Sequence, residues 1–580
     1  MRIRVLLALT SLFLLPTAFS QTSDEKSPAP PTFDYQVAHA HELKPHRRSI
    51  PMKGVQAGFN QIHLAVIVSP SGDVLDVHPT EEVDPPPPDG GALKFWPQLQ
   101  NEVRQWKFTP FEQNGNPVTA QVEEYIDLVP PERLPKAHVA PPSLRPNSKI
   151  SVSLQRSGCF GSCPSYTVTV STDGIVFEGG AYVVARGRHT AGVDAKAVRK
   201  LASRFVAADF YSMEPKYVAS VTDNPTYVLS IDIDGNKKTV EDYVGSWEGM
   251  PAVISDLEEE VDDLAKTDRW IEGNDGLVPL LQVERFNFQS FEAQIMLKEA
   301  ARRGRSETVR ELVAAGVPLD QLPPPHPKDG QELGPDFRTV GLLTPASGNF
   351  QTLQILLDAG ASRNDQRDKD LALAGAARSG SVEAARALIA YGANPNSDLS
   401  KVTATERSGG MTIQGPGAGS VLIEAASSGN PEMIKEILRY HPNLEARGYE
   451  GKTAIFAAGE YRNSDKEGAR VECVRLLAQA GADVNARDKN GNTPLHEIYL
   501  TDVEEELLKL GADVNARNKD GETPIFTNVD NDSIALFIRY GADLTIRNNE
   551  GQDVVQADNY SGPERKEALR KALQSLAEKK

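Results

Sequence analysis

Two cysteines that stand four positions apart are the residues of this sequence best suited to chemistry. Cys159 and Cys163 lie in the run Arg-Ser-Gly-Cys-Phe-Gly-Ser-Cys-Pro-Ser-Tyr, and a proline follows the second thiol. In an oxidising compartment the pair would form a disulfide, and closing so short a loop stabilises a fold by only about 2 kcal/mol. Thiol redox chemistry and copper binding are the alternatives. Because an alternating strand pattern follows the motif, we expect the structural disulfide.

The sequence has no further group with the spacing of a metal centre or a catalytic site. Zinc at the cysteine pair would require two more ligands, and His189 is the only later histidine of that region. His39 and His41 fall in a proline-rich stretch that supplies no fixed geometry for a metal. Cys473 lies in a helical apolar pattern and is expected to be buried. We therefore predict no enzyme activity, no metal and no cofactor.

Composition narrows the classes of partner. The chain has 580 residues, a net charge of −18 and a pI near 5.2, and its length allows about four domains. Nucleic-acid binding requires a basic face that neutralises phosphates, so an acidic chain disfavours it. Docking on anionic lipid is disfavoured for the same reason. Three cysteines are too few for a disulfide-dense scaffold.

The amino terminus has the pattern of an export signal. Residues 1–20 open with two basic residues, continue with an apolar run that is too short to span a bilayer, and end in small residues. This order is typical of a secretory signal peptide cleaved between Ser20 and Gln21. We therefore expect a periplasmic or secreted protein without stable membrane insertion. Residues 21–45 are polar and proline-rich, which predicts a flexible linker.

Residues 46–131 predict a first domain of the α+β class. Apolar strand patterns at 62–68 and 74–77 flank a Ser-Pro-Ser-Gly-Asp turn, and a helical pattern runs over 92–106. The sequence Asn114-Gly115 marks a further turn before a strand pattern at 118–128.

Three runs of this domain carry a family resemblance: Ile-Val-Ser-Pro-Ser-Gly at 67–72, Val-Arg-Gln-Trp-Lys-Phe-Thr-Pro at 103–110, and Asn-Gly-Asn-Pro-Val at 114–118. They resemble the C-terminal domain of TonB-family energy transducers, although four consecutive prolines at 85–88 depart from that pattern. The resemblance implies that Trp106 and Phe108 are core residues. It also implies a sheet edge that can pair with an extended peptide.

A second proline-rich linker at 132–146 precedes an α+β domain at 147–270. Alternating strand patterns and two helical patterns, at 195–206 and 250–265, define its class. The run Cys-Phe-Gly-Ser-Cys-Pro-Ser-Tyr is similar to the signature of an uncharacterised bacterial domain. That resemblance implies no function.

The C-terminal part, residues 291–580, contains an internal repeat. The run Asp-Val-Asn-Ala-Arg-Asp-Lys-Asn-Gly at 483–491 recurs at 513–521 and more loosely at 543–551. Thr-Pro follows two copies and Gly-Ala precedes each, as expected for helix starts and ends. These residues resemble ankyrin repeats, in which His496 would be structural. We count seven repeats and a divergent cap from Asp553.

Two of the expected β-hairpin fingers are enlarged, at 318–338 and 397–419, and are either functional or disordered. The predicted fold class is therefore multidomain: two small α+β domains followed by an all-α ankyrin solenoid with β-hairpin fingers. The predicted function is the binding of protein partners, mainly by the array. The residues most suited to this contact stand at exposed finger tips: Lys489, Asn490, Lys519 and Asp520. Strand addition by an envelope transport component and thiol redox chemistry remain the alternatives.

Overall fold

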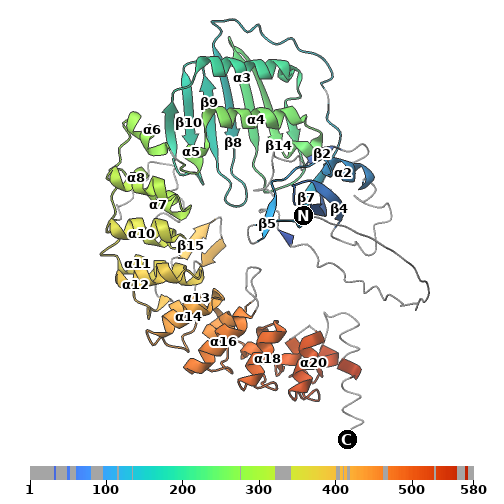
Figure 1. Ribbon diagram of the computed structural model, residues 1–580, viewed down its shortest axis with the longest axis vertical. Helices are drawn as coiled ribbons and strands as arrows, with labels where there is room; N and C mark the ends of the chain where they lie inside the picture. The colour runs from blue at the N-terminus through green and yellow to red at the C-terminus, as the bar shows by residue number, and fades with distance from the viewer. Residues whose placement is uncertain are drawn as a thin grey trace, which may run out of the picture. The chain divides into compact units, whose positions relative to one another are not determined.

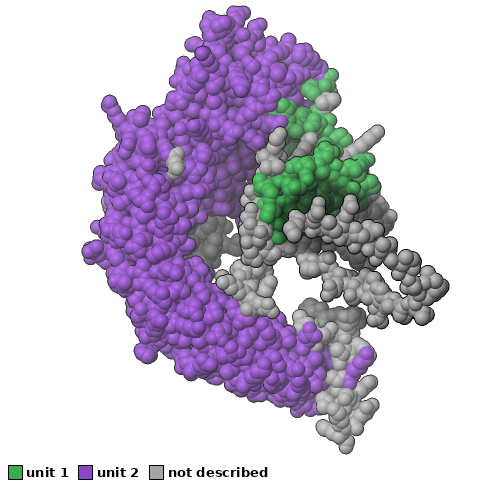
Figure 2. Space-filling view, in the orientation of Figure 1, with its two compact units in different colours: residues 1–136, 216–221, 242–254 green, residues 137–215, 222–241, 255–580 purple. Residues whose placement is uncertain are grey.

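A computed structural model divides the chain into two compact units (Figures 1 and 2). The first comprises residues 1–136, 216–221 and 242–254, and the second comprises 137–215, 222–241 and 255–580. The described residues are 32–33, 49–51, 61–79, 96–113, 116–133, 135–274, 276–320, 341–399, 405–408, 411–414, 419–460, 468–527, 531–557 and 569–571. The expected signal peptide and most of the expected linker at 21–45 lie outside them.

The first unit contains a sheet whose central strand is β7 (Ala120–Val129). Strand β3 (Gln61–Val68) pairs with it in antiparallel orientation and also pairs with β4 (Val74–Pro79). Two short strands, β1 (Thr32–Phe33) and β2 (Ser49–Pro51), pair with β7 in parallel orientation. The sheet order is β1-β7-β3-β4, so β4 is an edge strand among the described residues.

Helix α2 (Trp96–Val103) supplies Leu99 and Val103 to the core of this sheet. Trp106 and Phe108 are 7% and 1% exposed, which confirms their prediction as core residues. The helix ends at Val103, before the predicted end at 106, and residues 92–95 of the predicted helix lie outside the described residues. The hairpin of β5 (Phe111–Gln113) and β6 (Asn116–Val118) follows. The predicted Asn-Gly turn lies outside the described residues.

The turn between β3 and β4 requires a glycine. Gly72 has a φ of +87°, and a Cβ atom there would lie 1.9 Å from the carbonyl oxygen of Phe108. The Phe108 N–H in turn donates to the Gly72 carbonyl at 2.9 Å. The sequence runs at 67–72 and 103–110, which both support the predicted domain, are therefore joined by this backbone hydrogen bond.

The second sheet has seven strands in the order β11-β10-β9-β8-β13-β14-β12. Their bounds are β8 (Ile150–Arg156), β9 (Tyr166–Ser171), β10 (Gly174–Gly179), β11 (Gly187–Ala191), β12 (Lys216–Val218), β13 (Tyr227–Ile233) and β14 (Asn236–Tyr243). Alternate residues of β8 and β9 are buried, because one face of the sheet is covered. Helices α3 (Ala195–Ala207) and α4 (Ala252–Ala265) lie across that sheet (Figure 1).

Two helices that the sequence analysis did not assign follow this sheet: α5 (Asp268–Ile271) and α6 (Leu277–Val283). Trp270 of α5 is fully buried, and its ring stacks on Phe177 with centroids 4.8 Å apart. The Gly273 carbonyl accepts a hydrogen bond from Thr308 Oγ1 at 2.6 Å. The α+β domain is thus joined to the first helices of the array within the second unit.

The array consists of stacked helix pairs (Figure 1). The pairs are α7 (Phe291–Arg302) with α8 (Ser306–Ala314), α9 (Leu343–Ala346) with α10 (Phe350–Asp358), α11 (Gln366–Arg378) with α12 (Val382–Ala390), α13 (Val421–Ser427) with α14 (Pro431–Leu438), α15 (Ala454–Gly459) with α16 (Ala469–Ala480), α17 (Pro494–Glu497) with α18 (Thr501–Lys509), and α19 (Pro524–Thr527) with α20 (Asn531–Arg539). Helix α21 (Val554–Ala557) lies where the sequence predicts the cap. A sheet-containing N-terminal part followed by a helical C-terminal part agrees with the predicted fold class.

The enlarged finger at 397–419 contains a β-hairpin among its described residues. Strands β15 (Thr405–Ser408) and β16 (Met411–Gln414) pair in antiparallel orientation, and Asp398 forms a bridge to Ser420. In the other enlarged finger, residues 321–338 lie outside the described residues.

We expect Trp270→Ala to lower the free energy of unfolding by about 3–5 kcal/mol, since it removes a fully buried aromatic side chain. Chemical denaturation followed by circular dichroism measures this loss. Phe160→Ala is the matched control, because Phe160 is 76% exposed and its change should stay within about 0.5 kcal/mol. Equal losses in the two variants would contradict the assigned packing.

Candidate functional site

The candidate site is the series of turns between the last repeats, here called the fingers. The fingers are residues 447–452, 487–492, 517–522 and 547–552. In the last three, the side chain of Asp488, Asn518 or Asn548 accepts hydrogen bonds from the backbone N–H groups two and four residues further on, at 2.8–3.1 Å. The glycine of each finger has a positive φ. The repeated Asx and Gly positions therefore shape each turn.

A ladder of backbone hydrogen bonds joins one finger to the next. The N–H of Lys489 donates to Glu450 O at 2.8 Å, that of Lys519 to Asn490 O at 2.9 Å, and that of Asn549 to Asp520 O at 2.8 Å. Each bond crosses from one repeat to the preceding one. The fingers consequently form one continuous surface.

Asparagine side chains make a second connection between repeats. Asn485 Nδ2 donates to Gly511 O at 3.1 Å, and its Oδ1 accepts from the N–H of Asp513 at 2.8 Å. Asn515 makes the same two bonds one repeat later, at 3.0 and 2.8 Å. The Asn of the Asp-Val-Asn-Ala-Arg motif thus satisfies one backbone carbonyl and one backbone N–H just after the second helix of the following repeat.

An arginine occupies the same position in all four fingers, and we call Arg447, Arg487, Arg517 and Arg547 the arginine row. Three of these guanidinium groups donate to the main-chain carbonyl of the next arginine in the row, at 2.5, 2.6 and 2.8 Å in chain order. Arg447, Arg487 and Arg547 also bond the carbonyl of the glycine four residues on. All four arginines are exposed. The repetition of Arg in the motif was the sequence signal that could have predicted this row.

The four predicted contact residues are all exposed in the structure. Lys489 and Asn490 stand at one finger tip, and Lys519 and Asp520 at the next. Their main chains participate in the ladder while their side chains face solvent. The structure therefore brings them into one row, alongside the arginine row.

His496 contacts its own helix start and the next repeat. Its Nδ1 lies 3.1 Å from the backbone nitrogen of Thr493, and its Nε2 lies 3.1 Å from Glu522 O. The ring is 1% exposed, and burial lowers the pKa of the imidazole. These contacts confirm the prediction that His496 is structural.

Charged pairs connect the helices of neighbouring repeats. Arg378 of α11 forms an ion pair of 2.5 Å with Glu424 of α13, whose side chain is 1% exposed. Arg386 of α12 pairs with Glu436 of α14 at 2.8 Å. A buried carboxylate without a cation is costly, so these pairs help to fix the order in which the repeats stack.

The cysteine pair closes the loop between β8 and β9. Cys159 and Cys163 form a disulfide with Cα atoms 5.5 Å apart, and Phe160 between them is 76% exposed. Tyr166, at the end of the motif, donates from its hydroxyl to Asp262 of α4 at 2.6 Å. Burial raises the pKa of the Asp262 carboxyl. The motif therefore fixes a loop and anchors it to the covering helix.

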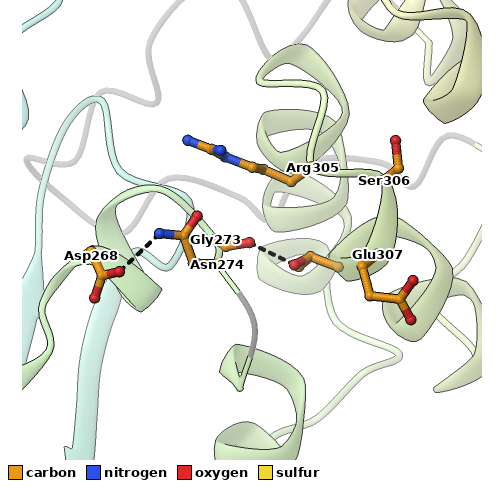
Figure 3. Close-up of a pocket in the computed structure, with 7 residues that line it drawn as sticks. Asp268, Gly273, Asn274, Arg305, Ser306 and Glu307 are labelled. Atoms are coloured by element: carbon orange, nitrogen blue, oxygen red, sulfur yellow. Dashed lines mark hydrogen bonds between the residues drawn. The ribbon is translucent and has the colours of Figure 1, made fainter. Parts of the chain in front are cut away.

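A cavity of about 540 Å³ lies between α5 and the start of α8 (Figure 3). The Asn274 side chain points toward Asp268 and donates to it at 2.8 Å. Arg305 Nη2 donates to Glu272 Oε2 at 2.7 Å, and Arg305 Nε donates to Glu272 O at 3.0 Å. These polar groups are already bonded to one another, so the cavity belongs to the joint between the α+β domain and the array.

Three further features bear on metal binding, on the remaining cysteine and on membrane insertion. Within the described part of the chain, no group of three or more His, Cys, Asp or Glu residues could hold a metal ion. His39 and His41 lie outside that part. Cys473 is buried and is not part of the disulfide, in agreement with the expectation from the sequence that it is buried. None of the helices described here has both the length and the apolar character needed to cross a bilayer.

Two family models match separate parts of the chain. Ankyrin repeats, in three copies, match residues 422–518, and a domain of unknown function, DUF6438, matches residues 150–265. The ankyrin match covers three helix pairs of the array: α13 with α14, α15 with α16, and α17 with α18. The other match contains Cys159 and Cys163. The chain therefore contains ankyrin repeats preceded by a DUF6438 domain.

Three curated proteins are similar to a short segment of this chain. Diacylglycerol kinase iota of Rattus norvegicus is 40% identical over 101 residues, and its Mus musculus and Homo sapiens counterparts are 39% identical over 101 residues. The matched segment covers 17% of this chain and 9% of each of these relatives. A match of this extent carries no activity from those proteins to this chain.

We expect acid to destabilise the repeat that contains His496. Because burial lowers the pKa of His496 in the folded protein, the unfolded chain takes up its proton first, near the ordinary pKa of about 6.5. This contribution to stability is thus complete above that pH and declines as pH falls below it. Denaturation at pH 7.5 and pH 5.5 measures the loss, which His496→Gln should reduce. An unchanged difference in that variant would refute the assignment.

Asn515→Ala should lower the free energy of unfolding by about 1–2 kcal/mol, because it removes two hydrogen bonds between repeats. Urea denaturation of the full chain measures the change. Lys519→Ala, an exposed substitution in the neighbouring finger, should change stability by less than about 0.5 kcal/mol. If Asn515→Ala is as stable as the wild-type chain, the bridge does not connect the repeats energetically.

Proposed function

We propose that this protein is an exported, non-enzymatic protein that binds protein partners mainly through the fingers of its ankyrin array. The observation that carries the proposal is the finger surface. Its backbone is held by hydrogen bonds between repeats, while Lys489, Asn490, Lys519 and Asp520 remain exposed. A pre-organised surface binds with a smaller loss of conformational entropy than a flexible one.

Two features support export to the periplasm or the extracellular space. The pattern of residues 1–20 is that of a cleavable signal peptide. The disulfide between Cys159 and Cys163 is of a kind that persists in oxidising compartments and is rare in the cytosol. Sequencing the amino terminus of the exported protein tests this part, since cleavage gives a chain that begins at Gln21.

A second candidate function belongs to the first unit. Among the described residues β4 is an edge strand, and Leu75 on it is 55% exposed. An extended peptide could pair with such an edge by strand addition, as the resemblance to TonB-family domains implies. This function would make the protein an envelope transport component, and it requires an uncleaved anchor. A mature chain that begins at Gln21 argues against it.

The third candidate, thiol redox chemistry, uses the disulfide. The loop containing Cys159 and Cys163 is partly exposed, so a thiol could reach it. Replacing both cysteines with serine separates the two roles. Loss of function in a folded variant supports redox chemistry, whereas retained function supports a structural bridge.

We expect the double variant Lys489→Glu/Lys519→Glu to lose most of the partner captured by cross-linking in the periplasm. The reason is that the two reversals introduce like charges or unmatched carboxylates at the contact. Quantitative mass spectrometry of the captured proteins measures the loss. Lys196→Glu, a reversal on the exposed part of α3 in the α+β domain, is the matched control and should capture the partner normally.

A chain that ends at residue 290 locates the site further. A partner captured only by the full chain places binding in the array. A partner that the shortened chain still captures moves the site to the two N-terminal domains and contradicts the proposal.

A further inference from the structure

The arginine row holds positive charge that the protein itself does not neutralise. In the described part of the chain, the guanidinium groups of Arg447, Arg487 and Arg517 donate to main-chain carbonyls and form no ion pair with a carboxylate. Arg547 has a carboxylate at 3.9 Å, on Asp553, and its side chain remains 56% exposed. The helix arginines differ, since Arg378 lies against a buried glutamate. On a chain of net charge −18, three consecutive fingers repeat an arginine that has no carboxylate partner among the described residues.

The carbonyl contacts hold the guanidinium groups in place. Each of the first three reaches the main chain of the next arginine, so its position is set by the backbone of two repeats. A guanidinium group has five N–H donors, and these bonds use only some of them. The remaining donors face solvent in a planar fork that matches a carboxylate. A ligand would therefore meet donors whose orientation is already fixed.

Repeat spacing defines the ligand geometry. Packed helices lie with their axes about 8–10 Å apart, so one arginine follows another at about this distance along the array. A polyproline II chain rises about 3.1 Å per residue with three residues per turn, which places every third side chain on one side at about 9 Å. A β-strand places every second side chain on one side at about 7 Å. The spacing expected for the row, about 8–10 Å, is closer to the first value than to the second.

We propose that the arginine row binds an extended acidic segment of a partner protein in the polyproline II conformation, with a carboxylate at every third residue. The inference rests on the proposed function, because it names the partner chemistry for the same fingers. Lys489 and Lys519 stand in the same fingers and add positive charge beside the row. The exposed ring of Tyr449, in the first finger, offers an apolar contact at one end.

An acidic protein segment fits better than a nucleic acid. Phosphates of a nucleic-acid strand would bring many closely spaced charges to a protein that is itself strongly acidic. The fingers also carry Asp520 and Glu550, which repel a continuous polyanion. A peptide with separated carboxylates avoids these side chains.

The test measures binding of labelled peptides to the full chain by fluorescence anisotropy. One peptide has glutamate at every third position in a proline-rich sequence. A second has the same number of glutamates at every second position, and a single-stranded oligonucleotide of equal charge is the third probe. We expect the first to bind at least about tenfold more tightly than the others, with an affinity that falls as salt rises.

Arg487→Gln and Arg517→Gln should each weaken the first peptide about tenfold, since each removes one charge-assisted contact. Lys196→Gln is the control: it removes one positive charge from the exposed part of α3, outside the fingers, and its affinity should equal that of the wild-type chain. Equal binding of all probes, tighter binding of the oligonucleotide, or wild-type affinity in both arginine variants would overturn the inference. If the peptide inference fails but the lysine reversals still abolish partner capture, the proposed function survives. If the peptide inference fails and the lysine reversals also leave partner capture unchanged, both proposals fail.

Discussion

The array depends on hydrogen bonds that each repeat can complete only with its neighbour. A single helix pair leaves the carbonyls at its carboxyl end and the main chain of its finger without partners. In this protein Asn485 and Asn515 supply those partners from the preceding repeat. The same bonds that stabilise the stack also determine where the exposed side chains stand. Stability and the geometry of the finger surface therefore have a common origin.

The α+β domain before the array belongs to this arrangement. The first helix pair of a solenoid has no preceding repeat to cover it. Here α5 and α6 take that place, because Thr308 donates to Gly273 and Arg303 pairs with Glu272 at 2.6 Å. Trp270 connects the same segment to the sheet through Phe177. The segment that follows the matched domain thus connects the sheet of the α+β domain to the first helix pair of the array.

The sequence predicts the local structure of this protein better than it predicts the contacts between segments that are distant in the chain. The Asp-Val-Asn-Ala-Arg motif and the Thr-Pro helix starts repeat at a fixed step, so the helix pairs, the turns and the structural role of His496 follow from local rules. Helices α5 and α6 have no repeat and no cap signal, and their packing depends on Phe177 and Thr308, which are distant in the chain. The predicted finger residues are exposed, but the arginine row was missed. A consensus arginine is read as structural until its lack of a carboxylate partner becomes visible.

The bridging side chains give the array a polarity. Arg447, Arg487 and Arg517 all reach forward, from an earlier repeat to a later one. Loss of the last repeat removes only the contact that Arg517 makes with Arg547 O. Loss of an inner repeat removes two contacts, the one that its arginine receives from the preceding repeat and the one that it donates to the following repeat. Because α5 and α6 cover the first helix pair, we expect fraying to begin at the carboxyl end, so that the finger farthest from the α+β domain opens before the ones that precede it.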